Sequence, residues 1–290
     1  MDATADCLTS LAALDPAPAA IAVVVNGPSD FDEPAARTTC PTISIVRSDT
    51  NRGYGGGCNL GARALLDADP SLDVLWFLNN DTLIAPNALA PLTAAFDAHP
   101  DVAIAGPVVV YADDPARVWF AGGRINRTLG YTRHTGYRSR TMPHEGRRVD
   151  FISGSAIAVR RDVWQRLGGF DESYFHYFED TDLCERAARL GRASYLVPEP
   201  LVQHRVSAAI AETGADRLNR LQSYYFARNR WRFLRRNMRG RAWIATLAAQ
   251  PPLAAYECVQ AIAARNWPEV RGRIEGLVAG ALGRSGQRPS

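Results

Sequence analysis

Three acidic residues stand within four positions in the stretch HYFEDTDLCERA, residues 176–187: Glu179, Asp180 and Asp182. They follow directly on a run dominated by aromatic side chains at positions 174–178. Adjacent carboxyl groups beside apolar surface lose hydration and repel each other, which perturbs their proton affinity and suits general-base catalysis. We therefore predict that Glu179 and Asp180 are catalytic residues.

The spacing of Asp182 and Glu185 has a simpler explanation, because an acid followed by Glu three positions later is typical of a helix start. Acidic residues near a helix N-terminus are also favoured by the helix dipole. The pattern predicts a helix near 182–190 that Asp182 and Glu185 begin and that Glu179 and Asp180 precede.

A second polar group follows the apolar run VLWFL at 74–78 and consists of Asn79, Asn80 and Asp81. A carboxylate at the end of a strand can hold a divalent cation that also binds diphosphate oxygens. The same three residues favour a turn, and the residue types leave both interpretations open. His204 follows another expected strand. A lone histidine is more often structural, but beside a metal-holding aspartate it becomes a plausible second ligand.

A glycine-rich segment, NRGYGGGCNLG at 51–61, follows the apolar run at 42–46. Its five glycines allow close backbone approach, and a helix N-terminus after it would offer N–H groups to phosphate or ribose. The segment is not a P-loop, since it has no lysine. It also lacks the G-x-G-x-x-G pattern, because Leu60 stands where the third glycine would be.

Short apolar runs alternate with stretches of helix-forming composition through the first two thirds of the chain. The runs are rich in β-forming residues and bounded by turn residues, which is typical of buried strands. This alternation predicts an α/β domain with a mainly parallel sheet and helices on both faces, and ligands gather at the carboxyl ends of such strands. The expected strands are 21–25, 42–46, 74–78, 102–111 and 193–197, and the expected helices are 57–66 and 86–98.

Residues 112–150 have little periodicity and predict either a long irregular connection or a mobile lid. A strand followed by a short helix is expected within 151–170. From about residue 211 the pattern is helical and rich in arginine. The expected organisation is a domain of residues 1–210 followed by a helical segment, 211–290.

The chain has 290 residues, enough for one large domain or for one domain with an appendage. All 33 basic residues are arginine, and the absence of lysine excludes Schiff-base, P-loop and Ser–Lys chemistry. The five cysteines never have C-x-x-C spacing, which argues against a zinc cluster and fits reduced thiols. Since no signal-peptide pattern and no membrane-spanning apolar run is found, we expect a cytoplasmic protein.

Residues 217–241 contain nine arginines and no acid, although the net charge of the whole chain is only +3. Three interpretations compete: a solvated helix face, a nucleic-acid patch, or a surface helix attracted to anionic lipid. The apolar residues that follow, including Trp243, Ile244 and Leu247, favour a membrane surface. We expect no nucleic-acid partner.

Several stretches together resemble glycosyltransferase family two and, within it, the bacterial rhamnosyltransferase-like branch. The longest match is FISGSAIAVRRDVWQRLGGFDESYFHYFEDTDLCERAARLG at 151–191. Shorter matches, in the family's order, are AVVVNGPSD at 22–30, NRGYGGGCNLGAR at 51–63 and LNNDT at 78–82.

The resemblance implies a GT-A fold and an inverting single displacement on a nucleotide-activated sugar. Asp180 would be the general base that takes the proton of the acceptor hydroxyl, with Glu179 beside it. Asp81 would hold Mn²⁺ or Mg²⁺ against the donor diphosphate, and His204 would be the second metal ligand.

The resemblance also implies a donor site, an acceptor site and a cellular setting. Ser153, Gly154 and Phe178 would contact the acceptor, which would be a lipid-linked or polysaccharide glycan. The expected location is the inner face of the bacterial cytoplasmic membrane, as a peripheral protein in cell-envelope glycan synthesis. The expected donor-binding residues are Asn26, Arg52, Gly53, Asn59, Asn79, Asn80 and Asp81.

Two features depart from the family pattern. Val25 stands where the family carries an aspartate that reads the nucleotide base. Met1 falls after the place of the family's first strand, so the resemblance predicts a sheet without that strand. These departures leave one alternative function, a degenerate transferase-like protein that binds sugar or acts as a scaffold without catalysis.

Overall fold

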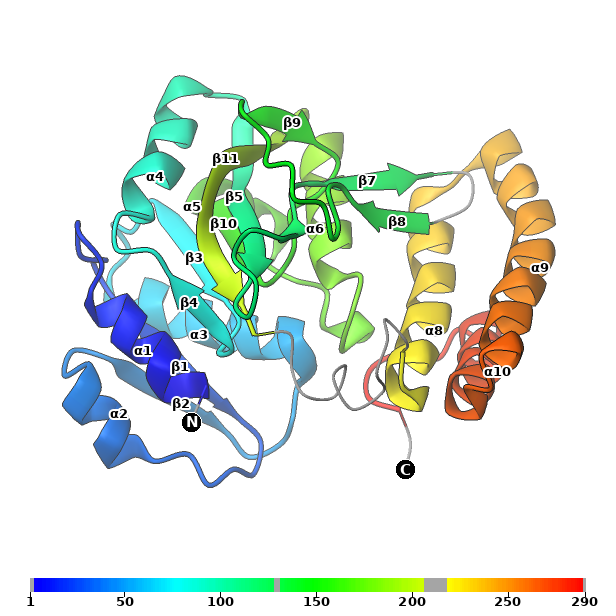
Figure 1. The fold of residues 1–290 in the computed structure, drawn as a ribbon, viewed down its shortest axis with the longest axis horizontal. Coiled ribbons are helices and arrows are strands. Elements are labelled where there is room, and N and C mark those ends of the chain that lie inside the picture. Colours follow the sequence, from blue (N-terminus) through cyan, green and yellow to red (C-terminus); the bar gives the residue numbers. More distant parts are fainter. Residues whose placement is uncertain (1–2, 128–130, 206–217, 289–290) are drawn as a thin grey trace. The chain divides into compact units, whose positions relative to one another are not determined.

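The computed structural model describes residues 3–127, 131–205 and 218–288, which form two compact units (Figure 1). The boundary expected between residues 210 and 211 lies outside the described residues. Unit 1 comprises Met1–Arg124, His134–Glu172 and Glu179–Arg205, and unit 2 comprises Ile125–Arg133, Ser173–Phe178 and Val206–Ser290.

Unit 1 contains the main β-structure of the chain. A two-stranded parallel sheet pairs β1 (Ala22–Asn26) with β2 (Ser44–Ser48). A larger sheet of seven strands has the order β3 (Val74–Leu78), β10 (Ala156–Arg160), β5 (Val102–Tyr111), β11 (Ala193–His204) and β4 (Thr82–Ile84). Its remaining strands are β6 (Val118–Phe120), which pairs with β5, and β9 (Arg147–Val149), which pairs with β11.

The expected α/β class is confirmed, but the larger sheet is mixed, so the prediction of a mainly parallel sheet was wrong. Within it only β5 and β11 run parallel, and the β3–β10, β10–β5, β11–β4, β5–β6 and β11–β9 pairs are antiparallel. A strand covered on both faces reads as a continuous apolar run whatever the direction of its neighbours. The apolar runs therefore identified strands without fixing their direction.

The two sheets remain separate in the described part of the chain. There β1 pairs only with β2, and β3 pairs only with β10. Helix α1 (Ala3–Ala12) contributes to the packing of both, because Leu11 contacts the hydrophobic cluster under β1 and β2 and also the cluster around α4 (Leu89–Ala98).

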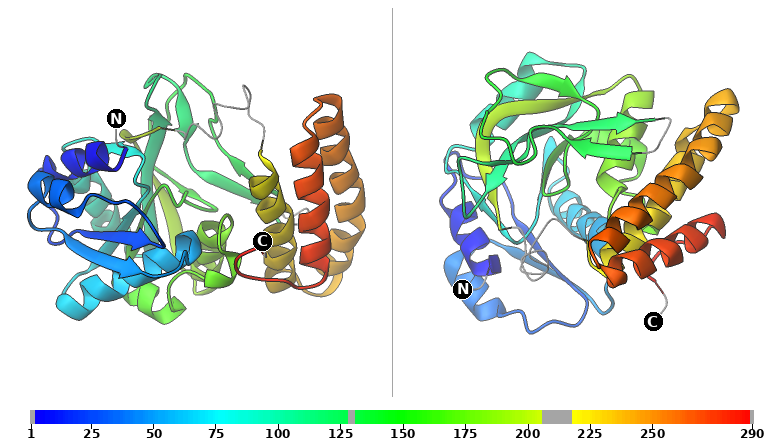
Figure 2. Two further views of the ribbon diagram at one scale, coloured as in Figure 1. Left: turned by 90° about the horizontal axis from the view of Figure 1, so that it is seen from below. Right: turned by 45° about the vertical axis from the view of Figure 1, so that its right-hand side comes forward.

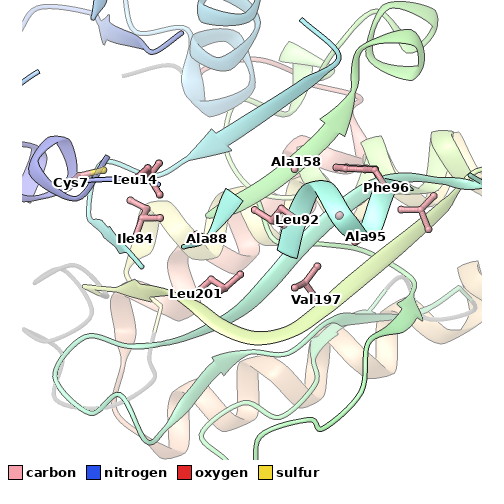
Figure 3. Packing of buried hydrophobic residues seen from close by; sticks show 12 residues of the cluster. Cys7, Leu14, Ile84, Ala88, Leu92, Ala95, Phe96, Ala158, Val197 and Leu201 are labelled. Atoms are coloured by element: carbon pink, nitrogen blue, oxygen red, sulfur yellow. The ribbon is translucent and has the colours of Figure 1, made fainter. Parts of the chain in front are cut away.

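Helices cover both faces of the larger sheet, as expected. Adjacent strand residues point to opposite faces, and on β3 Trp76 packs against the cluster that includes α4. Its neighbour Phe77 instead contacts Trp164 of α5 (Arg161–Leu167), with ring centroids 4.7 Å apart. Figure 3 shows Leu92 and Phe96 of α4 in one buried cluster with residues of the sheet.

The strands at 74–78 and 102–111 have the predicted bounds, whereas the helices begin elsewhere. Helix α3 (Gly53–Ala68) begins four residues before the expected start at 57, so the glycine-rich segment lies inside the helix. The expected irregular stretch 112–150 contains β6 and β9, together with β7 (Gly123–Asn126) and β8 (Tyr131–His134). The other helices of unit 1 are α2 (Glu33–Thr39) and α6 (Glu179–Arg189).

Unit 2 is mainly helical, and the three helices described within residues 218–288 lie alongside one another (Figure 2). Three glycines at four-residue spacing, Gly272, Gly276 and Gly280, form the contact of the last helix with the first. A Cβ atom at Gly276 would lie 2.3 Å from the Tyr224 carbonyl oxygen. The helices therefore pack closer than larger residues would allow. They are α8 (Arg220–Asn237), α9 (Gly240–Ala263) and α10 (Trp267–Ala281).

Over the described ranges, none of the helices combines the length and apolar character needed to cross a membrane. The longest, α9, has 24 residues and contains Pro251 and Pro252.

Candidate active site

The acidic stretch lies at the start of α6, which begins at Glu179. Glu179 and Asp180 therefore occupy its first turn, and the prediction that they precede a helix begun by Asp182 and Glu185 was wrong. Immediately before the helix, Phe175, Tyr177 and Phe178 have φ values of 65°, 68° and 74°. Large side chains rarely adopt this left-handed conformation, so the sequence pattern did not reveal where the helix starts.

Asp180 is held by backbone N–H groups. Its Oδ2 accepts a hydrogen bond from the Gly154 N–H at 2.8 Å, and its Oδ1 accepts one from the Thr181 N–H at 2.6 Å. Burial raises the pKa of Asp180, while these N–H donors act in the opposite direction, and the net shift is upward. A carboxylate with raised proton affinity and a fixed orientation can act as a general base.

Glu179 differs from its neighbour because no hydrogen bond satisfies its Oε2 atom, which is buried. The residue is 5% exposed. Burial and the adjacent charge of Asp180 raise the pKa of Glu179 to about 8. At neutral pH Glu179 is therefore mainly protonated, and Asp180 is the member of the pair whose carboxylate accepts backbone N–H hydrogen bonds.

Asp182 has a structural partner. It is fully buried and forms an ion pair with Arg186 at 2.6 Å, one helical turn later. The same guanidinium donates to the carbonyl oxygens of Leu167 and Gly169 at 2.9 and 2.8 Å. Through Arg186, Asp182 thus fixes the turn after α5, so it has a structural role and is not available as a catalytic base.

Gly154, predicted as an acceptor-site residue, lies between Asp180 and Tyr54. The Tyr54 hydroxyl donates to the Gly154 carbonyl. A Cβ atom at position 154 would lie 3.1 Å from the Tyr54 ring, which explains the glycine. Ser153, the second predicted residue of this turn, is buried and accepts a hydrogen bond from the Ser155 hydroxyl at 3.1 Å.

Three predicted donor-site residues meet where β1 ends and α3 begins. The Asn26 side-chain amide donates to the Gly53 carbonyl at 2.8 Å, and its oxygen accepts from the Arg52 N–H at 2.9 Å. Gly53 itself has a φ of 74°. A Cβ atom at Gly57 would lie 3.1 Å from the Asn26 amide nitrogen, so the glycines allow this close approach.

Asn59, another predicted donor-site residue, makes its hydrogen bonds within the chain. Its amide group donates to the Phe170 carbonyl at 2.9 Å and to Glu172 at 3.1 Å, and its oxygen accepts from the Phe170 N–H at 2.9 Å. Arg52 contacts the same Glu172 at 3.1 Å. These bonds attach the segment 170–172 to α3.

Asp81 and His204, 123 residues apart in the sequence, are brought together by the pairing of β4 with β11. Asp81 Oδ1 lies 3.0 Å from His204 Nε2. Their side chains are 19% and 9% exposed. The Trp119 ring stands edge-on to His204, with centroids 4.5 Å apart. The arrangement presents one carboxylate oxygen and one imidazole nitrogen side by side.

Asn79 and Asn80 connect β3 to Asp81 and form the turn that the residue types favour. The Asn79 carbonyl accepts a hydrogen bond from the Thr82 hydroxyl at 2.7 Å, and the Asn79 N–H donates to the Ser155 carbonyl at 3.1 Å. The Asn80 side chain donates to Thr4 at 2.9 Å. The turn is thus attached to the Ser153–Ser155 segment that holds Asp180.

Phe178 belongs to unit 2, where it is 6% exposed. Its ring packs near Phe226 and Phe233, with centroids 6.2 and 5.7 Å away. This packing fixes the chain just before Glu179, and contact of Phe178 with an acceptor stays a prediction.

Sequence reasoning missed three side chains beside these groups: Tyr54, Trp119 and His134. The ring centroids of Trp119 and His134 lie 5.0 Å apart. Burial lowers the pKa of His134 to about 4, so its side chain is neutral at physiological pH. The only signal for Tyr54 was an aromatic residue inside the glycine-rich segment. The other two fall in the stretch that the sequence predicted to be irregular.

The sequence matches a known family, described as Glycosyltransferase like family 2, over residues 2–233. The N-acetylglucosaminyl-diphospho-decaprenol L-rhamnosyltransferase of Mycobacterium tuberculosis is 29% identical over 236 residues, which cover 75% of this chain and 76% of that protein. The dTDP-rhamnosyl transferase RfbF of Shigella flexneri is 22% identical over 221 residues, covering 74% and 71% of the two chains.

Among solved structures, a mannosyltransferase from Pyrobaculum calidifontis, in complex with GDP-Man and Mn²⁺, superimposes with a TM-score of 0.56. The alignment covers 96% of this chain and 83% of that one at 16% sequence identity, and it confirms the expected GT-A fold. Because the family match spans most of the sequence, the chain belongs to glycosyltransferase family 2, in its rhamnosyltransferase-like branch.

Proposed function

We propose that the protein is an inverting glycosyltransferase that moves rhamnose or another hexose from a nucleotide-diphosphate donor to a lipid-linked or polysaccharide acceptor. The observation that carries this proposal is the state of the acidic pair. Burial protonates Glu179, whereas the Gly154 and Thr181 N–H groups orient the Asp180 carboxyl group and favour its ionised form. One oriented carboxylate is what a single displacement requires to activate an acceptor hydroxyl.

In this proposal Asp180 removes the proton of the acceptor hydroxyl as that oxygen attacks the anomeric carbon. The bond from the anomeric carbon to the donor diphosphate breaks, and the nucleoside diphosphate leaves with the bonding electrons. Attack from the face opposite the leaving group inverts the anomeric configuration. Tyr54 acts as a positioning residue because its hydroxyl holds the Gly154 turn whose N–H orients Asp180.

Asp81 and His204 fit a divalent cation such as Mn²⁺ or Mg²⁺. Adjacent ligands of an octahedral ion at about 2.1 Å lie roughly 3.0 Å apart, and Asp81 Oδ1 and His204 Nε2 are separated by 3.0 Å. Among the residues whose placement is described, no third His, Cys, Asp or Glu completes a metal-binding group. Water and the donor diphosphate would supply the other ligands, and a bound cation would offset the charge of the leaving group.

The donor's nucleotide would lie near the junction of β1 and α3. The Asn26 side chain holds Arg52 and Gly53 there, at the beginning of α3. Val25 is 6% exposed and has an apolar side chain, so it offers the nucleotide base no hydrogen bond. We infer that the donor's nucleotide is recognised mainly by backbone groups and by Asn26, and not by the side chain at position 25.

The relatives support a lipid-linked acceptor, since the mycobacterial one is named for a diphospho-decaprenol acceptor. Exposed apolar side chains on unit 2 support docking at the inner surface of the cytoplasmic membrane. On α9, Ile244, Tyr256 and Val259 are 68%, 61% and 60% exposed, and Trp267 on α10 is 61% exposed. Such side chains can enter a lipid headgroup region without a spanning helix.

A donor screen tests the proposal. The purified protein would be incubated with Mn²⁺, a panel of nucleotide sugars that includes dTDP-L-rhamnose, and a prenyl-diphospho-N-acetylglucosamine acceptor. Mass spectrometry should detect one added deoxyhexose or hexose, and NMR should show inversion at the anomeric carbon. Retention of configuration would contradict the single displacement. Donor binding without any turnover would favour the degenerate, sugar-binding alternative.

A further inference from the structure

Unit 2 contains a cavity of about 330 Å³ whose lining is dominated by positive charge. Two glycines, Gly280 and Gly283, complete the described lining, and none of the lining residues within 218–288 is acidic. The five charged lining residues are Arg228, Arg232, Arg235, Arg236 and Arg284. We call them the cavity arginines.

Helix geometry explains why the charges gather. Four of the cavity arginines are on α8, and positions 228, 232, 235 and 236 share one helix face because they are separated by three or four residues or by two turns. On the opposite side, Gly280 approaches α8 so closely that a Cβ atom would lie 2.9 Å from the Trp231 Cβ. The glycine therefore lets α10 pack directly against α8 beside these arginines.

Several other arginines of unit 2 have carboxylate partners. Arg220 pairs with Glu275 at 2.5 Å, and Arg230 pairs with Glu257 at 2.8 Å. Arg273 is likewise paired with an acid. Among the ion pairs described for residues 218–288, none involves Arg228, Arg232, Arg235 or Arg284. The paired acids Glu257, Glu269 and Glu275 are therefore not among the described residues that line the cavity.

Arg228 shows how the charge is held. It is 1% exposed, and its guanidinium donates to neutral oxygens, the carbonyls of Tyr174 and Gly286, both at 2.5 Å. The Tyr225 ring lies 4.8 Å from the guanidinium carbon. Burial lowers the pKa of Arg228, and a buried charge that has no counter-charge is costly. An anion in the cavity would offset that cost.

The neighbouring arginines retain donors for such an anion. The Arg232 Nε atom is buried without a hydrogen-bond partner. Arg235 uses one amino group to bind the Ala281 carbonyl at 2.7 Å. Arg284 is exposed at the cavity. Guanidinium groups bind phosphate oxygens through paired, charge-assisted hydrogen bonds.

We propose that the cavity arginines form a binding site for a phosphate-class anion, most simply a diphosphate group. The volume corresponds to about ten water molecules at roughly 30 Å³ each, more than a single small ion needs. The site goes beyond the proposed transfer reaction, because it lies within unit 2 and uses none of the groups around Asp180. The anion could come from a soluble phosphate compound or from a lipid headgroup.

The test measures binding of inorganic diphosphate to the full chain by calorimetry at fixed ionic strength. A parallel arm measures sedimentation with neutral phosphatidylcholine vesicles and with vesicles that also contain phosphatidylglycerol. The variant Arg232→Gln/Arg236→Gln removes two charges from the cavity. The control Arg239→Gln/Arg271→Gln removes two charges from exposed positions of unit 2 outside it. Both variants therefore lower the overall charge equally.

We expect the cavity variant to weaken diphosphate binding at least tenfold and the control to change it less than twofold. That pattern in the calorimetric arm indicates a soluble ligand, and the same pattern confined to anionic vesicles indicates a lipid headgroup. Absence of binding in both arms would overturn the site. The site would also be overturned if both variants lost diphosphate affinity equally. It would be overturned as well if the same arginines bound single-stranded RNA more tightly than diphosphate. If the double variant does not fold, Arg284→Gln, on an exposed residue, replaces it, with about threefold weaker binding expected.

Discussion

The first turn of α6 in unit 1 and the cavity face of α8 in unit 2 both crowd like charges, but they stabilise them differently. On α6 the crowded acids are stabilised in three ways. Glu179 takes up a proton, Asp182 pairs with Arg186, and Asp180 accepts hydrogen bonds from backbone N–H groups. A carboxyl group can change its protonation, so crowding leaves one reactive carboxylate.

Arginine cannot follow the same route, because its guanidinium stays protonated in proteins. On the cavity face of α8 the charge of Arg228 is spread over carbonyl oxygens and an aromatic ring, and none of the ion pairs described for residues 218–288 involves Arg228, Arg232 or Arg235. Crowded acids thus produce a site for proton transfer, whereas crowded arginines produce a site for an anion. Variants that affect one region and not the other can establish this difference.

The largest effect is expected for Asp180→Asn. The amide cannot accept the hydroxyl proton, so turnover should fall by about 10³-fold, within the range for loss of a general base. Donor binding and diphosphate binding by the cavity arginines should be unchanged. The measurements are steady-state kinetics with the donor found in the screen, and calorimetry.

Asp162→Asn is the matched control, because Asp162 is exposed in the first turn of α5. It should keep normal turnover. Turnover of Asp180→Asn within threefold of the unaltered protein would show that the base lies elsewhere.

The next effect is expected for Asp81→Ala, which leaves His204 without its partner at 3.0 Å. Turnover should fall by about 10²-fold, because the cation loses its carboxylate ligand. Calorimetry of Mn²⁺ with a nucleoside diphosphate should show weakened binding of the metal, a result that does not depend on turnover. Asp73→Ala, at a side chain 88% exposed, is the control. Full turnover of the unaltered protein in EDTA would contradict the metal site.

The sequence predicted several elements of the fold correctly, and those that it missed depend on tertiary packing. Strands β3 and β5 were predictable because apolar runs buried on both faces leave a clear pattern. The direction of their neighbours was not, since it depends on how the chain returns to the sheet. The start of α6 was missed because tertiary packing holds Phe175, Tyr177 and Phe178 in a conformation that their local preferences oppose.

The pair Asp81 and His204 shows the limit of local patterns. The residue types left a turn and a metal site equally open for Asp81, and His204 alone favoured a structural role, so only the resemblance to a family assigned both as metal ligands. The strand pairing that brings them together spans more than a hundred residues. The cavity arginines illustrate the reverse case: their charge was evident from the sequence. Their separation from the acids of α10 was not, because helix packing determines it.

A smaller effect, on stability, is expected for Glu179→Gln. The folded-state pKa is about 8, against an ordinary value of 4.5, so between these pH values the folded chain binds the proton and the unfolded chain does not. This group therefore makes the protein lose stability as pH rises, by up to about 1.4 kcal/mol per pH unit. Because glutamine cannot ionise, Glu179→Gln removes this contribution to the pH dependence of the unfolding free energy.

Denaturant titrations at pH 5, 6.5 and 8 measure the effect. The variant should gain stability relative to the unaltered protein as pH rises, by about 2 kcal/mol between pH 6.5 and 8. The exposed Glu145→Gln should show no such trend. A constant difference at all three pH values would mean that Glu179 is already ionised, and the contrast between a protonated acid and permanently charged arginines would fail.

The smallest effect is expected for Gly276→Ala, which tests whether close packing of α8 and α10 maintains the anion site. Its new Cβ would lie 2.3 Å from the Tyr224 carbonyl oxygen, so the helices must move apart. Overpacking costs about 1–3 kcal/mol, and alanine returns up to about 1 kcal/mol through helix propensity. Denaturant unfolding should therefore show a net loss of about 1 kcal/mol. Val278→Ala, at a side chain 54% exposed on the same helix, should change stability by less than about 0.5 kcal/mol.

Diphosphate binding should weaken in Gly276→Ala while Mn²⁺ binding at Asp81 is unchanged, because the substitution moves the arginines and leaves the acids in place. If Gly276→Ala weakened the binding of diphosphate and of Mn²⁺ equally, the arginine cavity and the acidic site would be energetically coupled.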